Sequence, residues 1–138
     1  MTLDPDVIRS RCTEIEESIA RLEQLAAMSR EQFLADRDSQ DIACYRLLVT
    51  IEAALALCFH VSTRRLRKAP EDYAACFTTL EAAGLVPHDL SERLQLMARF
   101  RNLLVHMYWK VDYGRVYEIM QGDVADLRRF ASIIAGLL

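Results

Sequence analysis

The chain has 138 residues, of which 52% are hydrophobic and 27% charged, with a formal net charge of −3 and only four glycines and three prolines. This length predicts one domain over residues 1–138, large enough to bury a core. Scarce glycine and proline disfavour a turn-rich β protein and favour long helices. The acidic balance excludes a generally basic nucleic-acid-binding domain, so any contact with RNA must come from a local patch.

Cysteine and histidine residues are scattered along the chain. The four cysteines form no C-x-x-C pair, and the three histidines are equally dispersed: Cys12, Cys44, Cys58, Cys76, His60, His88 and His106. A structural zinc site needs closely spaced ligands, so we expect neither a metal ion nor a cofactor. The cysteines are interpreted as small core residues of a protein in a reducing cytosol.

The chain shows no targeting or membrane signal. Its first residues, Met-Thr-Leu-Asp-Pro-Asp, lack the basic and apolar regions of a signal peptide. No uninterrupted apolar run approaches the roughly 20 residues that a membrane-spanning helix needs. We therefore expect a soluble, cytoplasmic protein with no membrane contact.

The first predicted helix runs from about Pro5 to Met28. Apolar residues recur along it at spacings of three and four, which places them on one stripe: Ile8, Cys12, Ile15, Ile19, Leu22 and Leu25. Ser29 followed by Gln32 is a capping-box pattern, and it predicts a short second helix that extends through Leu34.

A polar, turn-like stretch from Asp36 to Gln40 separates this short helix from a long one, expected from Gln40 to Arg65. Apolar residues cover most of the circumference of the long helix, including Leu47, Leu48, Ile51, Leu55, Leu57 and Phe59. A helix that is apolar nearly all round is buried. We expect this helix to be the most buried one, in the core and in an interface.

A basic run, Arg64-Arg65-Leu66-Arg67-Lys68, follows the long helix. Cations at this position stabilise a helix C-terminus through the helix dipole. The same Arg64, Arg65, Arg67 and Lys68 are also suited to bind an RNA backbone. The sequence leaves both interpretations open.

Two more helical stretches follow. Pro70 is expected to start a helix that Gly84 ends, and Pro87 to precede a helix from about His88 to Lys110. Val111-Asp112 breaks the pattern.

Asp112 is a candidate N-cap for a last helix that ends near Leu137, with Gly122 as a candidate bend. The predicted fold is all-α, an up-and-down bundle of four long helices with an extra short one.

The segment from Phe100 to Trp109 combines three functional side chains. Arg101 is followed five positions later by His106, and Tyr108 lies two further on. Arginine is permanently charged and matches the geometry of phosphate oxygens. Histidine exchanges a proton near neutral pH without special tuning. The combination predicts phosphodiester chemistry or phosphate binding, and we favour the first.

A helical wheel places these side chains on different faces of the helix. Apolar residues share the core sector: Leu90, Met97, Phe100, Leu104 and Met107. His106 falls nearly opposite, so it is not a core histidine. Asn102, one turn earlier, is placed to hydrogen-bond the His106 ring or a ligand. Arg101 and Tyr108 share a flank between core and solvent.

Arg101 and His106 point about 140° apart on a straight helix, so one helix hardly aims both at one phosphate. Pairing two such helices across a two-fold axis brings both residue types into one cleft. Val105 and Trp109 lie on the His106 side, and an exposed Trp commonly marks an interface. We therefore expect a homodimer.

The stretch Arg101-Asn102-Leu-Leu-Val-His106-Met-Tyr108 resembles the R-N-x-x-x-H-x-Y signature of HepT-like toxins in the HEPN superfamily. The similarity extends to Ser-Arg-Glu-Gln-Phe-Leu-Ala-Asp (29–36), Ile-Glu-Ala-Ala-Leu (51–55), Leu-Val-Pro (85–87) and the segment 108–119. A bare R-x4-H is a weak signal, but the full signature in this context is specific.

The resemblance implies a HEPN-like helical homodimer with the Arg–His motifs lining a cleft between subunits. Proteins of this type are metal-independent ribonuclease toxins that act on RNA such as tRNA or mRNA. Their antitoxin is an MNT-type nucleotidyltransferase that transfers AMP to the motif tyrosine. By position, Arg101 and His106 are then catalytic, Asn102 supports them, and Tyr108 is the AMPylation site.

This chemistry is coherent because RNA carries its own nucleophile, the 2′-OH. His106 is suited to remove the 2′-OH proton and Arg101 to stabilise the developing phosphorane charge. The leaving-group acid stays open, with His106 of the partner subunit as one candidate. AMP on Tyr108 would block the cleft and repel an RNA backbone.

Two alternatives belong to other classes. In the first, the chain is a non-catalytic helical module in which Arg101 binds a nucleotide phosphate or the cleft binds only a nucleotidyltransferase partner. Such a module tolerates glutamine at position 106, whereas a ribonuclease does not. In the second, the chain is a purely structural dimeric bundle, and neither Arg101 nor His106 matters.

Overall fold

The computed structural model describes residues 2–138, and helices are the only regular elements in that range. The helices are α1 (Pro5–Ala26), α2 (Arg30–Ala35), α3 (Arg37–Arg64), α4 (Tyr73–Ala82), α5 (His88–His106), the 3₁₀ helix η1 (Tyr108–Lys110), α6 (Tyr113–Glu118), the π-helical turn η2 (Ile119–Asp123) and α7 (Val124–Ala135). The all-α fold class is confirmed.

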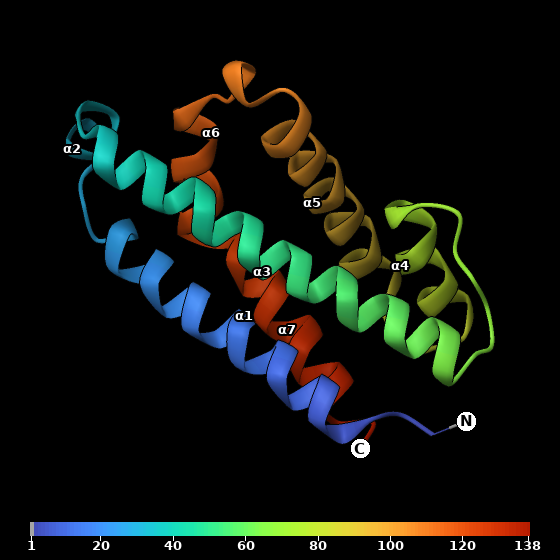
Figure 1. Ribbon diagram of the computed structural model, residues 1–138. Helices are drawn as coiled ribbons and strands as arrows, with labels where there is room; N and C mark the ends of the chain where they lie inside the picture. Colours follow the sequence, from blue (N-terminus) through green and yellow to red (C-terminus); the bar gives the residue numbers. More distant parts are fainter. Residues whose placement is uncertain (1) are drawn as a thin grey trace.

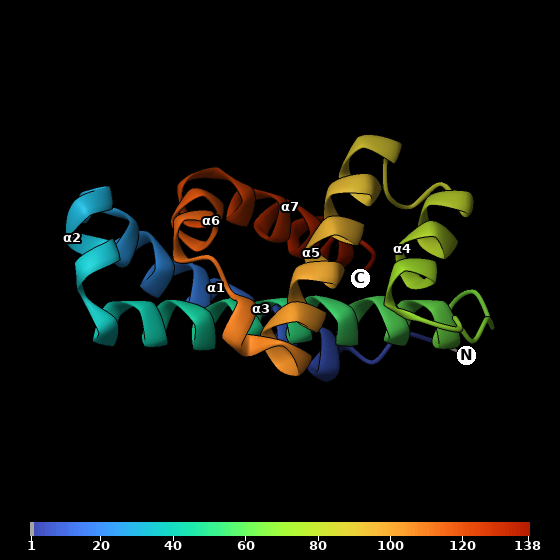
Figure 2. The same cartoon turned by 90° about the horizontal axis from the view of Figure 1, so that it is seen from above.

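The long helices alternate in direction. α1 and α3 lie side by side, α7 packs against both, and α4 and α5 pack together against α3 (Figure 1). Seen from above, α4, α6 and α7 stand on one side of α3, while the C-terminal end of α5 reaches down to the level of α3 (Figure 2). This arrangement places the end of α5 beside the middle of α3.

The first two helices follow the sequence prediction closely. Asp4 caps α1, because its side chain accepts a hydrogen bond from the backbone N–H of Asp6 (3.0 Å). The predicted apolar stripe is buried, apart from the half-buried Cys12. Ser29 and Gln32 form the predicted capping box, with both reciprocal bonds at 3.1 Å.

The polar stretch at residues 36–40 is not a turn, as the sequence suggested, but the first turn of α3. Asp36 alone separates α2 from α3, and its carboxylate accepts hydrogen bonds from the Asp38 backbone and the Ser39 hydroxyl. Gln40 donates to the carbonyl groups of Phe33 and Leu34 at the end of α2. These polar side chains cap the end of α2 and the start of α3, so the expected loop is not formed.

α3 has more buried residues than any other helix in the described range, as predicted, and most of its apolar side chains are buried. The sequence predicted no segment able to span a bilayer, yet α3 is long and apolar enough by length and composition, with a mean hydropathy of 1.9 over 18 residues. Half of that window is buried inside the fold, against α1, α4, α5 and α7. A core helix shows this pattern of burial.

α4 begins at Tyr73, three residues after the predicted start at Pro70. Asp72 decides the start, because its carboxylate accepts a hydrogen bond from the Ala75 backbone N–H (2.7 Å). The end follows the prediction: Gly84 adopts a left-handed conformation (φ 77°) directly after the helix, which glycine tolerates without strain.

The last predicted helix is interrupted. Asp112 caps α6 as expected, through a hydrogen bond from the Gly114 N–H (2.9 Å). The predicted bend at Gly122 takes the form of the π-helical turn η2. Next to Gly122, Gln121 donates a hydrogen bond to the Ala26 carbonyl at the end of α1 (2.9 Å). The turn therefore ties the last helical segment to α1.

Candidate active site at the end of α5

The helix that carries the motif is shorter than the sequence predicted: α5 ends at His106 and not at Lys110. Met107 leaves the helical region (φ −138°, ψ 43°), although its N–H still bonds to the Leu103 carbonyl (2.9 Å). The Lys110 N–H then bonds back to the Met107 carbonyl (2.8 Å) and closes η1. This tight turn reverses the chain so that Asp112 can cap α6.

Three residues contact the Arg101 guanidinium. Its Nε donates a hydrogen bond to the carboxylate of Glu52 on α3. Its Nη1 donates to Asn102 Oδ1 (3.1 Å), and the guanidinium carbon lies 4.8 Å from the centroid of the Tyr73 ring on α4. Only 15% of the Arg101 side chain is exposed. The contacts fix the guanidinium, and no other side chain within residues 2–138 engages its remaining N–H groups, which can therefore meet an anion.

Asn102 does not contact the His106 ring, the interaction that the sequence suggested. Its side-chain oxygen accepts the hydrogen bond from Arg101. Asn102 is therefore a hydrogen-bonded neighbour of the arginine, and the residue is exposed at the helix surface.

His106 is the last residue of α5 and is exposed. Within residues 2–138, no hydrogen bond or ion pair engages its ring. The prediction that this histidine lies outside the core is confirmed. A ring that is free at both nitrogens can exchange a proton with a bound substrate.

One chain does not bring Arg101 and His106 together. The Arg101 side chain is turned toward Glu52 and Tyr73, whereas His106 lies on the open end of the helix. Within residues 2–138, no hydrogen bond joins the two side chains.

Tyr108 and Trp109 are exposed on η1, at 69% and 66%. Their rings meet edge to face, with centroids 5.4 Å apart. The prediction that Tyr108 shares a helical stripe with Arg101 is wrong, because α5 ends between the two residues. The prediction of an exposed apolar surface here is confirmed, since Val105 is exposed as well.

The basic run lies away from this site. Arg64 ends α3, Arg65 caps it, and Arg67 adopts a left-handed conformation (φ 55°) in the loop that follows. Arg64, Arg65, Arg67 and Lys68 are all exposed, and none forms an ion pair with a residue of the described range 2–138. Glu52 and Arg64 are 12 positions apart on one helix, or roughly 18 Å along its axis.

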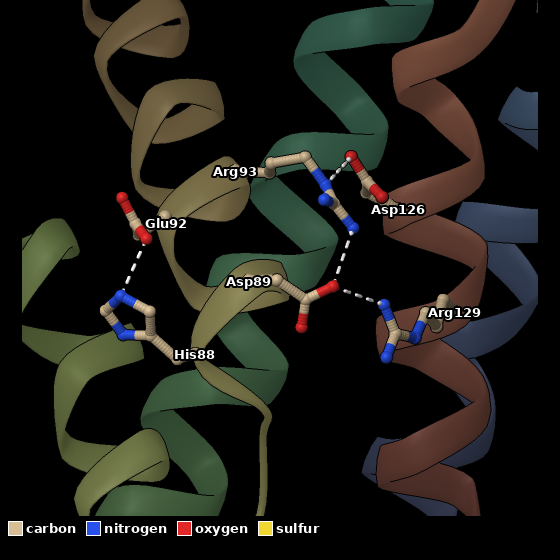
Figure 3. Close-up of polar contacts among 6 residues, drawn as sticks. All are labelled: His88, Asp89, Glu92, Arg93, Asp126 and Arg129. Atoms are coloured by element: carbon tan, nitrogen blue, oxygen red, sulfur yellow. Dashed lines mark hydrogen bonds and ion pairs between the residues drawn. The ribbon is translucent and has the colours of Figure 1, made fainter.

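The other histidines have local roles. His60 accepts a hydrogen bond from the Asp4 backbone N–H (3.0 Å), and burial, followed by the nearby charge of Arg64, lowers its pKa. His88 lies between Glu81 and Glu92 at the start of α5, and Figure 3 shows its contact with Glu92. Both histidines stand apart from the end of α5.

The cysteines are free thiols, two of them buried and two half-buried. Burial raises the pKa of the Cys44 thiol to about 11, so it stays protonated at neutral pH. In the described residues, no group of three or more His, Cys, Asp or Glu side chains is placed to hold a metal ion.

Glu52 and Tyr73 were missed by the sequence interpretation. Glu52 did carry a signal, because it is the only acidic residue between positions 42 and 70, inside the most apolar helix. Such a charge requires a partner when it is partly buried. Tyr73 had no comparable signal, since nothing local indicates that its ring lies under Arg101.

Comparison with known proteins gives a consistent result. The sequence model of the family described as Ribonuclease HepT-like matches residues 15–134. The mRNA nuclease HepT of Shewanella oneidensis is 26% identical over 129 residues, which cover 94% of this chain and 96% of that protein.

Solved structures agree with the fold. The tri-AMPylated Shewanella oneidensis HEPN toxin, solved in complex with its MNT antitoxin, superposes with a TM-score of 0.88 at 26% identity, covering 95% of this chain and 98% of that one. YutE, a cytosolic protein of unknown function from Bacillus subtilis, superposes with a TM-score of 0.85 at 18% identity, covering 99% and 91%. The second likeness concerns the fold alone.

Proposed function

Because the chain belongs to the HepT-like ribonuclease family, we propose that it is the endoribonuclease toxin of a toxin–antitoxin pair, with Arg101 and His106 as its catalytic residues. The observation that carries this proposal is the pairing of an anchored cation with an unengaged histidine at the exposed end of α5. The mRNA nuclease HepT and the HEPN toxin are similar to this chain over almost its whole length. Residues 1–138 accordingly act as one domain.

The proposed reaction uses the 2′-OH of RNA as its nucleophile. His106 removes the 2′-OH proton while this oxygen attacks the adjacent phosphorus. Arg101 stabilises the negative charge that develops on the phosphate oxygens. The fixed guanidinium needs little reorganisation, since Glu52, Asn102 and Tyr73 already hold it. This mechanism calls for no metal ion.

The catalytic unit is proposed to be a homodimer. Residues five apart on a straight helix point about 140° apart, so a cleft that contains both Arg101 and His106 needs two copies of α5. Val105 and Trp109 supply an exposed apolar surface next to His106, which a second subunit would cover. His106 of the partner subunit is then a candidate acid for the leaving 5′-oxygen.

The proposed control is AMPylation of Tyr108 by an MNT-type nucleotidyltransferase antitoxin. The related toxin from Shewanella oneidensis is described as tri-AMPylated and in complex with an MNT antitoxin. The Tyr108 hydroxyl is accessible for such a transfer, because the side chain is among the most exposed large residues of the chain. AMP would add bulk and negative charge beside His106 and exclude an RNA backbone.

The substrate is RNA, of the mRNA or tRNA class, in the cytoplasm. Arg64, Arg65, Arg67 and Lys68 are a candidate second contact with its backbone, since they are exposed and unpaired within residues 2–138. They lie far enough from Arg101 to contact a phosphate several nucleotides away from the cleaved bond. Neutralising them should weaken binding without changing the cleaved position.

The test is incubation of purified protein with total RNA and with tRNA in EDTA, beside the His106→Ala variant, after both are shown to be folded and their oligomeric state is measured. Intact-mass spectra report whether Tyr108 already carries AMP. Cleavage by the unmodified protein and none by the variant supports the proposal.

Equal cleavage by both proteins indicates a contaminant or another site. No cleavage by the folded, unmodified protein contradicts the proposal and favours the non-catalytic nucleotide-binding or partner-binding module. Cleavage of RNA by a folded monomer contradicts only the proposal that the catalytic unit is a dimer.

A further inference from the structure

A groove of about 260 Å³ lies between the first half of α3 and the chain from the end of α5 to the start of α6. Its lining, here called the Tyr45 groove, consists of Arg37, Asp41, Cys44, Tyr45, Leu48, Leu104, Tyr108, Val111 and Tyr113. Pockets for drug-sized ligands typically measure roughly 300 Å³ or more. The Tyr45 groove is thus sized for a smaller flat group.

Three tyrosine rings form the walls of the groove. Tyr45 and Tyr108 are 61% and 69% exposed, and Tyr113 is half-buried. Large rings on a protein surface commonly mark a binding site, and rings of this kind stack on nucleobases.

The groove is lined by one arginine and one aspartate, which pair with each other. The guanidinium carbon of Arg37 lies 6.0 Å from the Tyr113 centroid, and Arg46, which is not part of the lining, stands 5.6 Å from the Tyr45 centroid. Asp41, which pairs with Arg37 at 3.3 Å, adds a hydrogen-bond acceptor. Aromatic rings interleaved with arginines suit a nucleotide, whose base stacks while its phosphate meets a guanidinium.

The groove adjoins the catalytic arginine along two helices. On α3, Leu48 lines the groove and Glu52, one turn later, holds Arg101. On α5, Leu104 lines the groove and lies three positions after Arg101. One turn is about 5.4 Å, so the groove begins about one helical turn from Glu52, the residue that holds the guanidinium.

We propose that the Tyr45 groove is a nucleotide subsite, in which the base stacks against Tyr45 and the phosphate contacts Arg37. The proposal rests on the proposed function and extends it, because it assigns the place where the nucleotide beside the cleaved phosphate sits. A base enters such a groove only when it is unpaired and unstacked, so the substrate is single-stranded RNA. The Tyr108 ring is part of the same wall, so AMP bonded to its hydroxyl reaches this groove as well.

Binding is tested on the His106→Ala protein, which separates it from cleavage. A short, unstructured, labelled RNA is titrated and its anisotropy measured, with the corresponding duplex as competitor. Free 5′-AMP is titrated separately. The fluorescence of Trp109 measures AMP binding, because Trp109 is the only tryptophan of the chain and its ring contacts Tyr108.

Matched variants of the His106→Ala protein define the site. Tyr45→Ala should weaken RNA and AMP binding roughly tenfold, and Tyr45→Phe, which keeps the ring, by less than about twofold. Arg37→Gln is compared with Arg9→Gln, since both arginines are exposed and pair with an aspartate on their own helix. Only Arg37 lines the groove, so Arg37→Gln should weaken binding and Arg9→Gln should not.

The outcomes separate the alternatives. Binding that is unchanged by Tyr45→Ala, or weakened equally by Arg37→Gln and Arg9→Gln, overturns the proposal in favour of non-specific attraction. Tyr45-dependent AMP binding with Tyr45-independent RNA binding overturns the RNA assignment and identifies the adenylate of modified Tyr108 as the occupant. If the wild type fails to cleave RNA but the variants bind as expected, the nucleotide subsite is supported and the proposed ribonuclease function is contradicted.

Discussion

Glu52 on α3 accepts a hydrogen bond from Arg101 on α5, across 49 residues of sequence. The Arg101 side chain is 15% exposed and that of Glu52 42% exposed. A partly exposed ion pair contributes about 1 kcal/mol or less to stability, because water screens it and the side chains lose entropy. Its main consequence is therefore orientation: the carboxylate engages Nε and leaves the far edge of the guanidinium for a phosphate.

Replacing Glu52 by Ala should lower kcat for RNA cleavage at least about tenfold, because Arg101 loses its orientation in the transition state. KM should change far less, since the positive charge remains. Steady-state kinetics measure the two parameters, and thermal unfolding should show a small shift.

Glu52→Gln keeps a hydrogen-bond acceptor and should recover part of kcat, which a purely structural role would not predict. Glu31→Ala on α2 removes the same charge far from the site and serves as the control. A loss confined to KM, or the same loss in the control, contradicts the positioning role.

Arg101→Lys keeps the charge but should reduce kcat roughly a hundredfold. Lysine lacks the planar fork that bonds Glu52, Asn102 and a phosphate at once, and it stacks less well on Tyr73. Single-turnover cleavage measures the chemical step. Cleavage at the wild-type rate would show that any cation suffices at this position.

Much of the fold could be predicted because its signals are local. Asp4, Ser29, Asp112 and Gly84 end or begin helices through their own side chain or backbone, within a few residues. The end of α5 carried no such signal. The apolar and polar pattern continues through Trp109 without glycine or proline, and the helix stops because the chain must reverse toward α6.

Tyr108→Phe should abolish modification of the protein by an MNT-type nucleotidyltransferase. Phenylalanine keeps the ring at this exposed position but has no hydroxyl to accept AMP. Intact-mass spectra after incubation with the enzyme and ATP report the transfer. Tyr117→Phe is the control, since Tyr117 lies outside the Tyr45 groove and its hydroxyl donates a hydrogen bond to the Met28 carbonyl. Mass gain in Tyr108→Phe equal to that of the wild type would contradict the assignment.

The candidate site was predictable only in part. The residue types of the motif indicated Arg101, His106 and Tyr108, because their chemistry does not depend on the fold. Glu52 and Tyr73 act through contacts between α3, α4 and α5, and such contacts exist only once the helices pack. Asn102 shows the same limit. Its spacing from His106 suggested a hydrogen bond to the His106 ring, whereas its side chain bonds to Arg101.

Phe130→Ala should lower the free energy of unfolding by about 3–5 kcal/mol. Phe130 of α7 is fully buried, and its ring meets that of Phe77 on α4 edge to face at 5.5 Å between centroids. Truncation leaves a cavity and removes the aromatic contact. Urea denaturation measures the loss. Ala135→Gly on the exposed side of α7 should cost about 1 kcal/mol or less, and a similar loss in both variants would contradict the core assignment.

The start of α5 should show a pH-dependent contribution to stability that involves His88. Its Nδ1 lies 2.7 Å from Glu81 and its Nε2 2.6 Å from Glu92, and the hydrogen bond that the ring donates to Glu81, with the charges of both carboxylates, raises the pKa of His88. The neighbouring charges, Asp89, Arg93, Asp126 and Arg129, pair among themselves (Figure 3).

A histidine whose pKa is raised by folding stabilises the native state fully below its unfolded pKa of about 6.5, and the contribution disappears as pH rises through the folded value. His88→Asn should therefore lower Tm at pH 6 and leave it unchanged near pH 9. The shift should be no more than about 2 °C, because the side chain is exposed. His60, whose pKa is lowered, contributes with the opposite sign but cancels in the difference between wild type and variant.

Differential scanning calorimetry at the two pH values measures this difference. Glu81→Gln removes the stronger partner, so adding His88→Asn to it should give a smaller difference between the two pH values. An equal loss at pH 6 and pH 9 would mean that His88 acts through packing, and the proposed charge interaction would be wrong.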